Sequence, residues 1–472
     1  MKVQPSFNLL IVTLIFLGFA ACKDNTEEKA PKPKKVEPVL DLNDLKEAGH
    51  LRALIDNSST SYFVYKGAPM GFEYELLSRF AKEVDLELEV IPISNMDVVI
   101  DSLQALQGDI IAANLTVTRE RAEQLAFTEP LIYSHQVLVQ RADDDLVRTP
   151  SEMIGKEVYL RKNSSFYNRI QNLSEEVGGP IHIKEVSGNT SVEELIKQVS
   201  NGGIDYTVAD QHVAKINRAF YRNLYIKTPV SLEQQIAWAV RKTSPDLLNA
   251  INQWLEKFKK TVDFRVIYLK YYGNTSLYRS RVKSKLYTAK SGQISQYDEM
   301  IKAESEQAGW DWRLVSSLVY QESQFDHHAE SWAGAYGLMQ LMPETAQAYG
   351  VDSSSGPREN LKAGLKYLKW LEEEFKEKVA DSTERRKFVL AAYNVGLGHV
   401  YDAIRLATKH ELNPELWEEN VATMLKNKSK PKYYQDPVAY YGYCRGSEPF
   451  AYVNQIMKRY DHYKNMTDSL GS

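Results

Sequence analysis

The sequence is poor in cysteine and has no large excess of charge of either sign. Its 472 residues include two cysteines, Cys22 and Cys444, and neither has a neighbour at metal-ligand spacing, so no zinc site is expected. The formal net charge of −4 offers no basic surface, which argues against a nucleic-acid partner. With 43% hydrophobic and 25% charged residues, the chain has the balance of a globular protein with two or three domains.

No long apolar run is present near the N-terminus. The run Leu9–Ala21 is too short to span a bilayer as a helix, and with Lys2 before it and small residues at its end it is typical of a signal peptide. The sequence Phe-Ala-Ala-Cys at 19–22 resembles the lipobox of bacterial lipoproteins, although Phe19 replaces the usual aliphatic residue. That resemblance implies a signal peptide over 1–21 and lipidation of Cys22. The alternative is a plain signal peptide followed by a chance cysteine.

Residues 22–39 lack the apolar side chains that a folded core needs. They are charged and contain proline, which predicts a disordered tether able to reach roughly 50 Å when extended. Lys23 after the cysteine, in place of aspartate, favours the outer membrane. The expected location is therefore the cell envelope, with a lipid anchor in the outer membrane and the protein facing the periplasm.

Residues 40–272 alternate short apolar runs with amphipathic segments. Strands are expected at 51–55, 86–91, 109–113 and 204–209, and helices at 72–84, 96–107, 192–199 and 244–258. Ser244-Pro245 is a good helix N-terminal signal for the last of these. This alternation predicts an α/β domain with mostly parallel sheets.

Three stretches of this region resemble family 3 of the periplasmic solute-binding proteins, the amino-acid-binding type. They begin at Gly71 (GFEYELLSRFAKEVDLELEV), Gly108 (GDIIAANLTVTRERAEQLAFTEPL) and Ala239 (AVRKTSPDLLNAINQWLEKFKK). The resemblance implies two lobes joined by a hinge, with ligand between them. Lobe one would cover about 48–140 plus 228–272, and lobe two about 141–227.

The same resemblance assigns ligand-binding roles. Arg121 matches the arginine that pairs with a ligand carboxylate, a role that suits a guanidinium fork. Asp210 matches the acid that accepts the ligand's amino group. The further matching positions are Asn114, Thr116, Ser164 and Ser165. The alternative is an inherited scaffold that no longer binds anything.

Residues 293–470 have an almost purely helical pattern and follow an expected linker at 273–292. Helices are expected at 293–307, 310–323, 361–376 and 385–393. Leu314, Leu318 and Glu322 are spaced four apart, so Glu322 should stand at the end of an apolar stripe. A carboxyl group against apolar surface resists ionisation and can act as a proton donor near neutral pH. Alone, this pattern also fits an ordinary solvated glutamate.

Four ordered motifs change that balance, because together they resemble the soluble lytic transglycosylase family. They are Glu322-Ser323 with Ser331 and GAYGLMQLMP from Gly334, NLKAG from Asn360, AAYNVGLG from Ala391, and GYCRGSE from Gly442 with Tyr452-Val453. The resemblance implies an all-α, lysozyme-like fold. It makes Glu322 catalytic, Tyr393 an active-site tyrosine near the acid, and Asn394 part of the site. Substrate-groove positions would be Ser331, Gln340 and Glu448, the last with a structural role as an equal alternative.

The implied reaction is cleavage of peptidoglycan glycan strands between N-acetylmuramic acid and N-acetylglucosamine. Glu322 would protonate the leaving oxygen, the substrate acetamide would stabilise the cationic centre, and Glu322 would then take the C6 hydroxyl proton to give a 1,6-anhydro end. No metal or cofactor is implied. A muropeptide, stem peptide or amino acid would be the effector of the front module. The alternatives are a hydrolytic lysozyme that uses Asp326, and a catalytically silent sensing lipoprotein.

Overall fold

The computed structural model describes residues 40–143, 145–288 and 292–468, and the chain from Leu40 onward forms one compact unit. The expected signal peptide, Cys22 and the tether lie outside the described residues. Within those ranges, no helix is both long and apolar enough to cross a membrane.

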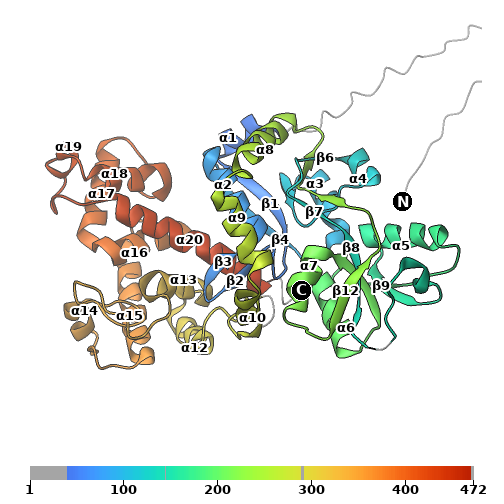
Figure 1. Ribbon diagram of the computed structural model, residues 1–472. Helices are drawn as coiled ribbons and strands as arrows, with labels where there is room; N and C mark the ends of the chain where they lie inside the picture. Colours follow the sequence, from blue (N-terminus) through green and yellow to red (C-terminus); the bar gives the residue numbers. More distant parts are fainter. Residues whose placement is uncertain (1–39, 144, 289–291, 469–472) are drawn as a thin grey trace, which may run out of the picture. The chain divides into compact units, whose positions relative to one another are not determined.

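The first lobe of the front module is built on a five-stranded sheet (Figure 1). Its order is β4 (Glu87–Ile93), β1 (His50–Asp56), β5 (Ile110–Ala112), β14 (Ala239–Arg241) and β6 (Leu125–Phe127). Its helices are α1 (Leu42–Ala48), α2 (Phe72–Glu83), η1 (Met96–Val98), α3 (Val99–Gln104), α4 (Arg119–Gln124), α8 (Pro245–Phe258), α9 (Val262–Tyr268) and η3 (Leu269–Gly273). The helix predicted over 244–258 is confirmed, with Ser244 at its N-cap.

The second lobe has the sheet order β10 (His182–Val186), β9 (Glu157–Arg161), β11 (Tyr206–Asp210), β8 (Gln136–Arg141) and β12 (Leu224–Pro229). Its helices are η2 (Pro150–Met153), α5 (Ser165–Glu176), α6 (Val192–Asn201) and α7 (Gln211–Arg218). A two-stranded pair, β7 (Ile132–Ser134) and β13 (Gln234–Ile236), marks where the chain passes between the lobes.

Two expectations for this module are wrong. The sheets are mixed rather than mostly parallel, because β14 runs antiparallel to β5 and β6, and β8 runs antiparallel to β11 and β12. The antiparallel strands β8 and β14 lie next to the two places where the chain crosses from one lobe to the other. The lobe boundary expected at residue 141 is also too late, because β8, which begins at Gln136, belongs to the second sheet.

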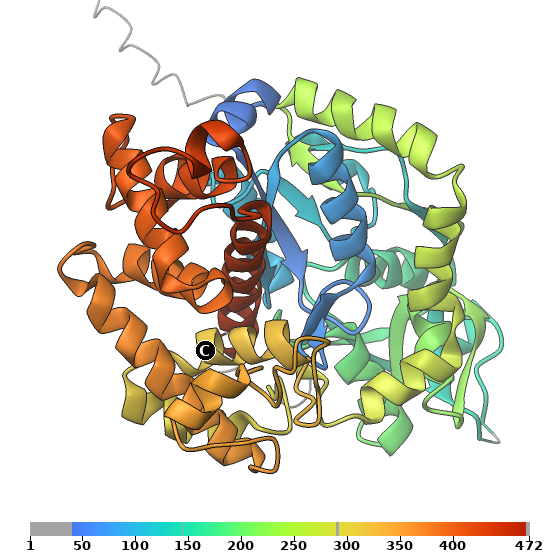
Figure 2. The ribbon, with the colours of Figure 1, turned by 90° about the vertical axis from the view of Figure 1, so that its left-hand side faces the viewer.

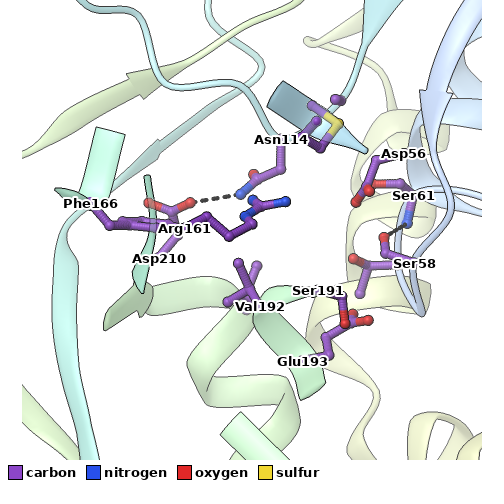
Figure 3. Close-up of a pocket in the computed structure, with 14 residues that line it drawn as sticks. Asp56, Ser58, Ser61, Asn114, Arg161, Phe166, Ser191, Val192, Glu193 and Asp210 are labelled. Carbon is purple, nitrogen blue, oxygen red and sulfur yellow. Dashed lines mark hydrogen bonds between the residues drawn. The ribbon is translucent and has the colours of Figure 1, made fainter. Parts of the chain in front are cut away.

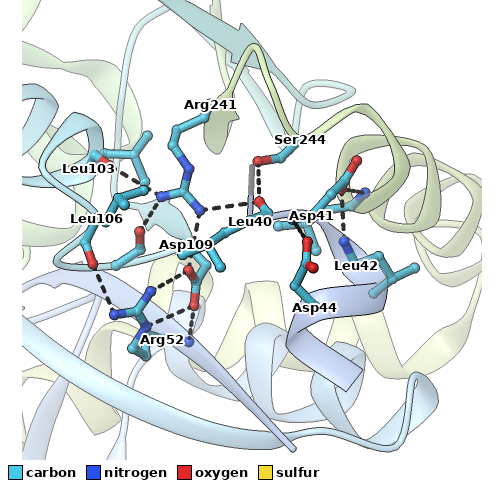
Figure 4. A network of polar contacts seen from close by, with 12 residues as sticks. Leu40, Asp41, Leu42, Asp44, Arg52, Leu103, Leu106, Asp109, Arg241 and Ser244 are labelled. Atoms are coloured by element: carbon cyan, nitrogen blue, oxygen red, sulfur yellow. Dashed lines mark hydrogen bonds and ion pairs between the residues drawn. The ribbon is translucent and has the colours of Figure 1, made fainter. Parts of the chain in front are cut away.

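A buried carboxylate ties the first lobe together, as Figure 4 shows. Asp109 is fully buried before β5 and accepts hydrogen bonds from Arg52 Nη2 at 2.7 Å and Arg241 Nη2 at 3.2 Å. Arg52 lies on β1 and Arg241 on β14, so one carboxylate holds three strands in register. Removing a partner from such a buried group would leave a charge unpaired. The Gly108-Asp109 part of the family-like stretch therefore has a structural role.

The rear domain is helical, as expected. It contains α12 (Asp298–Ala308), α13 (Trp312–Ser323), α14 (Pro343–Ala348), α15 (Pro357–Lys376), α16 (Ser382–Val395), α17 (Leu397–Lys409), η4 (Trp417–Val421), α18 (Ala422–Asn427), α19 (Pro431–Tyr434) and α20 (Ser447–Asp468). The helix expected from residue 293 begins only at Asp298. The Asp298 carboxylate accepts from the backbone N–H groups of Ile294 and Ser295, which holds the preceding residues in a turn.

The segment expected as a linker, 273–292, contains helix α10 (Thr275–Lys283). Tyr278 in this helix is buried, and its hydroxyl donates to Asn217 Oδ1 in the second lobe at 2.9 Å. Thr288 after the helix accepts from Val64 N in the first lobe at 2.9 Å. This segment therefore contacts both lobes before the chain enters the rear domain.

The front module and the rear domain meet at a hairpin formed by β2 (Phe63–Tyr65) and β3 (Ala68–Met70), beside α20 (Figures 1 and 2). Tyr463 on α20 donates to Gly67 O in the hairpin turn at 2.7 Å. A Cβ atom on Gly67 would lie 2.5 Å from a ring carbon of Tyr320 and 2.7 Å from one of Phe325. The turn thus packs against two residues that flank Glu322 in the sequence.

Candidate active site and ligand cleft

Glu322 lies in the last turn of α13, one residue before the helix ends at Ser323. The predicted apolar stripe is confirmed, because Leu314 and Leu318 are fully buried. Ser323 Oγ donates to Leu338 O at 3.0 Å and ties the helix end to the loop that follows. Gln324 and Phe325 have positive φ angles of 52° and 66°, so the chain turns sharply directly after the glutamate.

Burial raises the pKa of Glu322 to about 7, while a hydrogen bond from the Tyr452 hydroxyl to Glu322 Oε1 acts in the opposite direction. No other described carboxylate contributes to this shift. The Glu322 side chain nevertheless keeps part of its surface accessible. A carboxyl group with a pKa near neutrality can give up a proton and take one back at physiological pH.

The tyrosine that contacts the acid is Tyr452 on α20, which the sequence interpretation did not assign to the site. Tyr393, expected in that position, donates instead to Met339 O at 2.6 Å. Tyr393 still lies close enough for the charge of Glu322 to raise its pKa, although burial is the larger cause. Tyr452 belongs to the fourth sequence motif, but the spacing of that motif does not reveal that its hydroxyl contacts Glu322.

The loop between Ala329 and Leu341 is held largely by its own hydrogen bonds. Gln340 Nε2 donates to Ala329 O at 2.9 Å and to Gly337 O at 3.0 Å, so its amide hydrogens are used within the loop. Ser331 Oγ accepts from Ala335 N at 3.0 Å. Asn360 Oδ1 accepts from Met339 N at 2.9 Å. These contacts give Ser331 and Gln340 a role in holding the shape of the loop.

Two other expected groove residues lie at the protein surface. Asn394 and Glu448 are exposed, and the nearest charged partner of Glu448 is Arg445, at 3.8 Å. Asp326, the candidate second carboxylate of a lysozyme, accepts from His328 N at 2.9 Å within its own turn.

The front module encloses a cavity of about 70 Å³ between its lobes, shown in Figure 3. Asp56 ends β1, Asn114 follows β5, Arg161 ends β9 and Asp210 ends β11, and all four line this cavity. Ligands of α/β sheets bind outside the carboxyl ends of strands. That rule would have identified Asp56 and Arg161, which the sequence interpretation missed together with Glu193.

The residues expected to bind ligand are hydrogen-bonded to one another and to their own loops. Asn114 Nδ2 donates to Asp210 Oδ2 at 2.6 Å, and Ser165 Oγ donates to Thr116 Oγ1 at 3.0 Å. Both contacts join the first lobe to the second. Ser164 instead caps α5 by accepting from Tyr167 N at 3.2 Å.

Arg121 lies at the edge of this network. Its Nη1 donates to Thr116 O at 3.0 Å and its Nη2 to Asn163 O at 3.5 Å. Burial lowers the pKa of Arg121 to about 10, which leaves it cationic at neutral pH.

The cavity is rich in protonatable acids. Burial raises the pKa of Asp210 to about 7 and that of Glu193 to about 7, and it also raises the pKa of Asp56. Asp210 Oδ1 is buried without a hydrogen-bond partner among the described residues. A cationic group entering the cavity would favour the ionised form of these acids.

Comparison with known proteins defines the class first. Residues 51–274 match the family model described as bacterial extracellular solute-binding proteins, family 3, and residues 299–415 match the transglycosylase SLT domain. A mutant form of ArgBP from T. maritima is similar over 50% of this chain and all of its own, at 26% identity and a TM-score of 0.44. The chain is thus a two-lobed solute-binding module joined to a lysozyme-like transglycosylase domain.

Full-length relatives narrow the class to a family. A membrane-bound lytic murein transglycosylase F of Desulfosudis oleivorans is 35% identical over 89% of this chain and 91% of its own length. One of Pseudomonas fluorescens is 32% identical over 96% of this chain and 90% of its own length. The chain belongs to the membrane-bound lytic murein transglycosylase F family. It is therefore a membrane-associated lytic transglycosylase of peptidoglycan, and neither the lysozyme nor the silent-lipoprotein alternative is favoured.

Proposed function

We propose that Glu322 is the sole acid–base group of the reaction. It protonates the oxygen between N-acetylmuramic acid and N-acetylglucosamine as the bond breaks, and the substrate acetamide stabilises the developing positive charge. The resulting carboxylate then removes the proton of the C6 hydroxyl, which closes onto C1. The products are a 1,6-anhydro-muramyl end and a free N-acetylglucosamine hydroxyl, so no water is consumed.

The pKa of Glu322, raised to about 7 with no second carboxylate contributing, is the observation that carries this proposal. Inverting and retaining glycosidases generally need two carboxylates, whereas intramolecular attack needs one group that works in both directions. The Tyr452 hydroxyl would hold the carboxylate in place between the two steps. Mass spectrometry of digested peptidoglycan tests the proposal, because reducing ends in place of anhydro ends would contradict it.

We also propose that the front cleft binds a ligand with a carboxylate and an amine. Arg161, which lines the cavity, and Arg121, which lies near Arg161 but outside that lining, suit the carboxylate, and Asp210 with its unpaired oxygen suits the amine. Asn114, Thr116, Ser164 and Ser165 complete the proposed set. Stem peptides are the first candidate and free amino acids the second, because cell-wall peptides carry both groups and would report local wall turnover.

Ligand entry would require the lobes to part. The cavity of about 70 Å³ has room for a few water molecules at most, and the Asn114–Asp210 bond in its lining joins the two lobes. Hinge opening of this kind would break contacts between lobes and disturb helix α10, which contacts both lobes. Because the β2–β3 hairpin packs beside Tyr320 and Phe325, such a motion could be transmitted to the catalytic helix. Any such coupling is reciprocal.

Isothermal titration with stem peptides and amino acids tests the ligand, and cleavage assays with and without the bound compound test regulation. Binding should disappear in Arg121→Ala, and a bound ligand should change the rate of the wild-type enzyme. Saturable binding without any change in rate would reduce the front module to a positioning role. Absence of binding to every peptide and amino acid would contradict the ligand proposal itself.

We further propose that Cys22 is the lipidated mature N-terminus and that the anchor lies in the outer membrane. The proposal rests on the short apolar run that ends in Ala-Ala-Cys, and on Lys23 after it. Membrane fractionation of Cys22→Ala is the test. A cleaved Cys22→Ala protein that still sediments with outer membranes would contradict the anchor.

A further inference from the structure

A fully buried ion pair lies far along the sequence from Glu322, in the helices that follow Tyr393. Lys428 and Asp402 both have no exposed surface, and Lys428 Nζ lies 2.5 Å from Asp402 Oδ2 and 2.9 Å from His399 Nδ1. Arg405 also pairs with the same carboxylate. The cost of removing two charges from water makes a buried pair a poor device for stability alone. Its other contacts indicate what it holds in place.

Asp402 anchors the backbone of a loop. Its two carboxylate oxygens accept from Tyr440 N and Tyr441 N, each at 2.8 Å. Arg405 Nε donates to Val438 O at 2.7 Å, and its guanidinium group lies 4.2 Å from the centre of the Tyr440 ring. The loop is thus fixed by the buried carboxylate of Asp402 and by the half-buried guanidinium group of Arg405, which pairs with it.

This rigid loop presents aromatic side chains to solvent. Tyr440 is 72% exposed, Tyr441 57% and Tyr443 56%, although all three fall within four residues. Tyr441 lies against Gly398, where a Cβ atom would approach a Tyr441 ring carbon to 2.4 Å. Gly398 lies in the first turn of α17, directly after α16, which carries Tyr393. The loop itself leads through Gly446 into α20, which carries Tyr452.

We propose that Tyr440, Tyr441 and Tyr443 form a tyrosine platform that binds sugar rings of the glycan strand away from the bond being cut, and that Asp402 is its positioning residue. This rests on the proposed function of Glu322, because the platform is connected on both sides to elements that surround that acid. The apolar faces of pyranose rings stack on aromatic rings, and phenol hydroxyls bond to sugar hydroxyls. A side chain fixed in advance loses little entropy on binding. The platform lengthens the contact with a strand and favours long substrates.

The test compares long glycan strands, freed of peptides by an amidase, with a tetrasaccharide. In the double variant Tyr440→Ala/Tyr443→Ala, KM for long strands should rise about tenfold, the loss of two ring contacts, with kcat unchanged. KM and kcat for the tetrasaccharide should stay at wild-type values. Tyr133→Ala, which removes a tyrosine 55% exposed on β7 of the front module, is the matched control and should change neither.

Asp402→Asn keeps the side-chain shape and removes the charge, so the backbone of the loop should loosen. KM for long strands should rise as in the double variant, while kcat for the tetrasaccharide is retained. Equal losses on both substrates would assign Asp402 a purely structural role and overturn the positioning claim. The double variant, whose tyrosines are exposed, tests the platform even if Asp402→Asn does not fold.

Three further outcomes separate the possible failures. A defect of the double variant seen only with peptide-bearing strands would assign the surface to stem peptides and overturn the glycan platform. An active wild-type enzyme with an unchanged KM in the double variant would contradict the platform alone. Wild-type protein that releases no anhydro product from either substrate would contradict the proposed catalysis instead.

Discussion

Two acids in different regions of this protein share a pKa of about 7 and a common cause, but their surroundings differ. Glu322 in the rear domain is perturbed by burial, receives one hydrogen bond from Tyr452 and keeps part of its surface accessible. Asp210 in the front module is perturbed by burial as well, but it is enclosed, bonded to Asn114 across the cleft and subject to the charge of Arg121. A raised pKa alone therefore does not identify a catalytic acid.

The difference lies in what each acid can reach. Glu322 stands at a helix end and keeps part of its surface accessible. Asp210 ends a strand and is buried in the lining of the cavity between the lobes, where it would meet a group that enters between them. We infer that Glu322 exchanges protons with the substrate, whereas Asp210 binds a cationic group of a ligand.

The largest effect that would separate the two acids is expected for Glu322→Gln. The amide keeps the shape and removes the transferable proton, so release of anhydro-muropeptides should fall by roughly 10²–10⁴-fold or more. The melting temperature should stay near the wild-type value. Glu344→Gln on α14, an exposed glutamate of the same domain, is the control. Release of anhydro-muropeptides by Glu322→Gln at the wild-type rate would contradict the assignment of Glu322 as the acid–base group.

The second effect concerns the boundary between the two regions. Gly67→Ala places a methyl group against Tyr320 and Phe325, at a residue with φ +81°. Overpacking should cost roughly 1–3 kcal/mol of unfolding free energy, in addition to about 1–2 kcal/mol for the left-handed backbone. Catalytic activity should fall as well, because the clash acts on the helix that carries Glu322.

Gly49→Ala is a matched control for this change. Gly49 has φ +79°, but no atom lies within 4 Å of an added Cβ, so only the backbone cost remains. Denaturant unfolding and cleavage rates of both variants isolate the contact between modules. Equal losses of stability and activity in the two variants would show that the hairpin contact contributes nothing to the free energy of unfolding or to catalysis.

Much of this architecture could be predicted from local pattern. The strand predicted over 51–55 and the helix predicted over 244–258 were confirmed because their apolar residues repeat with the period of the element. The antiparallel β14 could not be predicted, since residues that lie over 100 positions apart decide its partners and direction. The delayed start of α12 depends on one side chain, Asp298, that folds back on the preceding backbone.

The residues of the two functional sites also differ in how far they could be predicted from the sequence. The apolar stripe that ends at Glu322 could be predicted because its residues are close together in sequence. Tyr452 lies 130 residues away and meets Glu322 only through the packing of α20 on α13. Asp56 and Arg161 could have been placed at the cleft by their positions at strand ends, whereas Glu193, in the first turn of α6, carries no such signal.

The third prediction sharpens the role of Tyr452. In the proposed role of general acid, Glu322 is active in its protonated form, so the rate should fall as pH rises through about 7. The Tyr452 hydroxyl stabilises the carboxylate and lowers the pKa of Glu322, so Tyr452→Phe should raise that pKa. The falling limb of the pH–rate profile should therefore move to higher pH. A limb that moves to lower pH, or does not move, would contradict this role of Tyr452.

The smallest expected effect tests the other acid through stability. The folded-state pKa of Asp210, about 7, lies above its ordinary value of 3.8, so the unfolded chain loses its proton first. Stability from this group is therefore fully present below pH 3.8 and is lost as pH rises to about 7. Asp210→Asn removes that dependence and can keep the bond with Asn114. Its melting temperature relative to wild type should be higher at pH 8 than at pH 5, measured without ligand. A difference that is the same at both pH values would mean that Asp210 is ionised in the closed cleft, and the contrast with Glu322 would then have to rest on geometry alone.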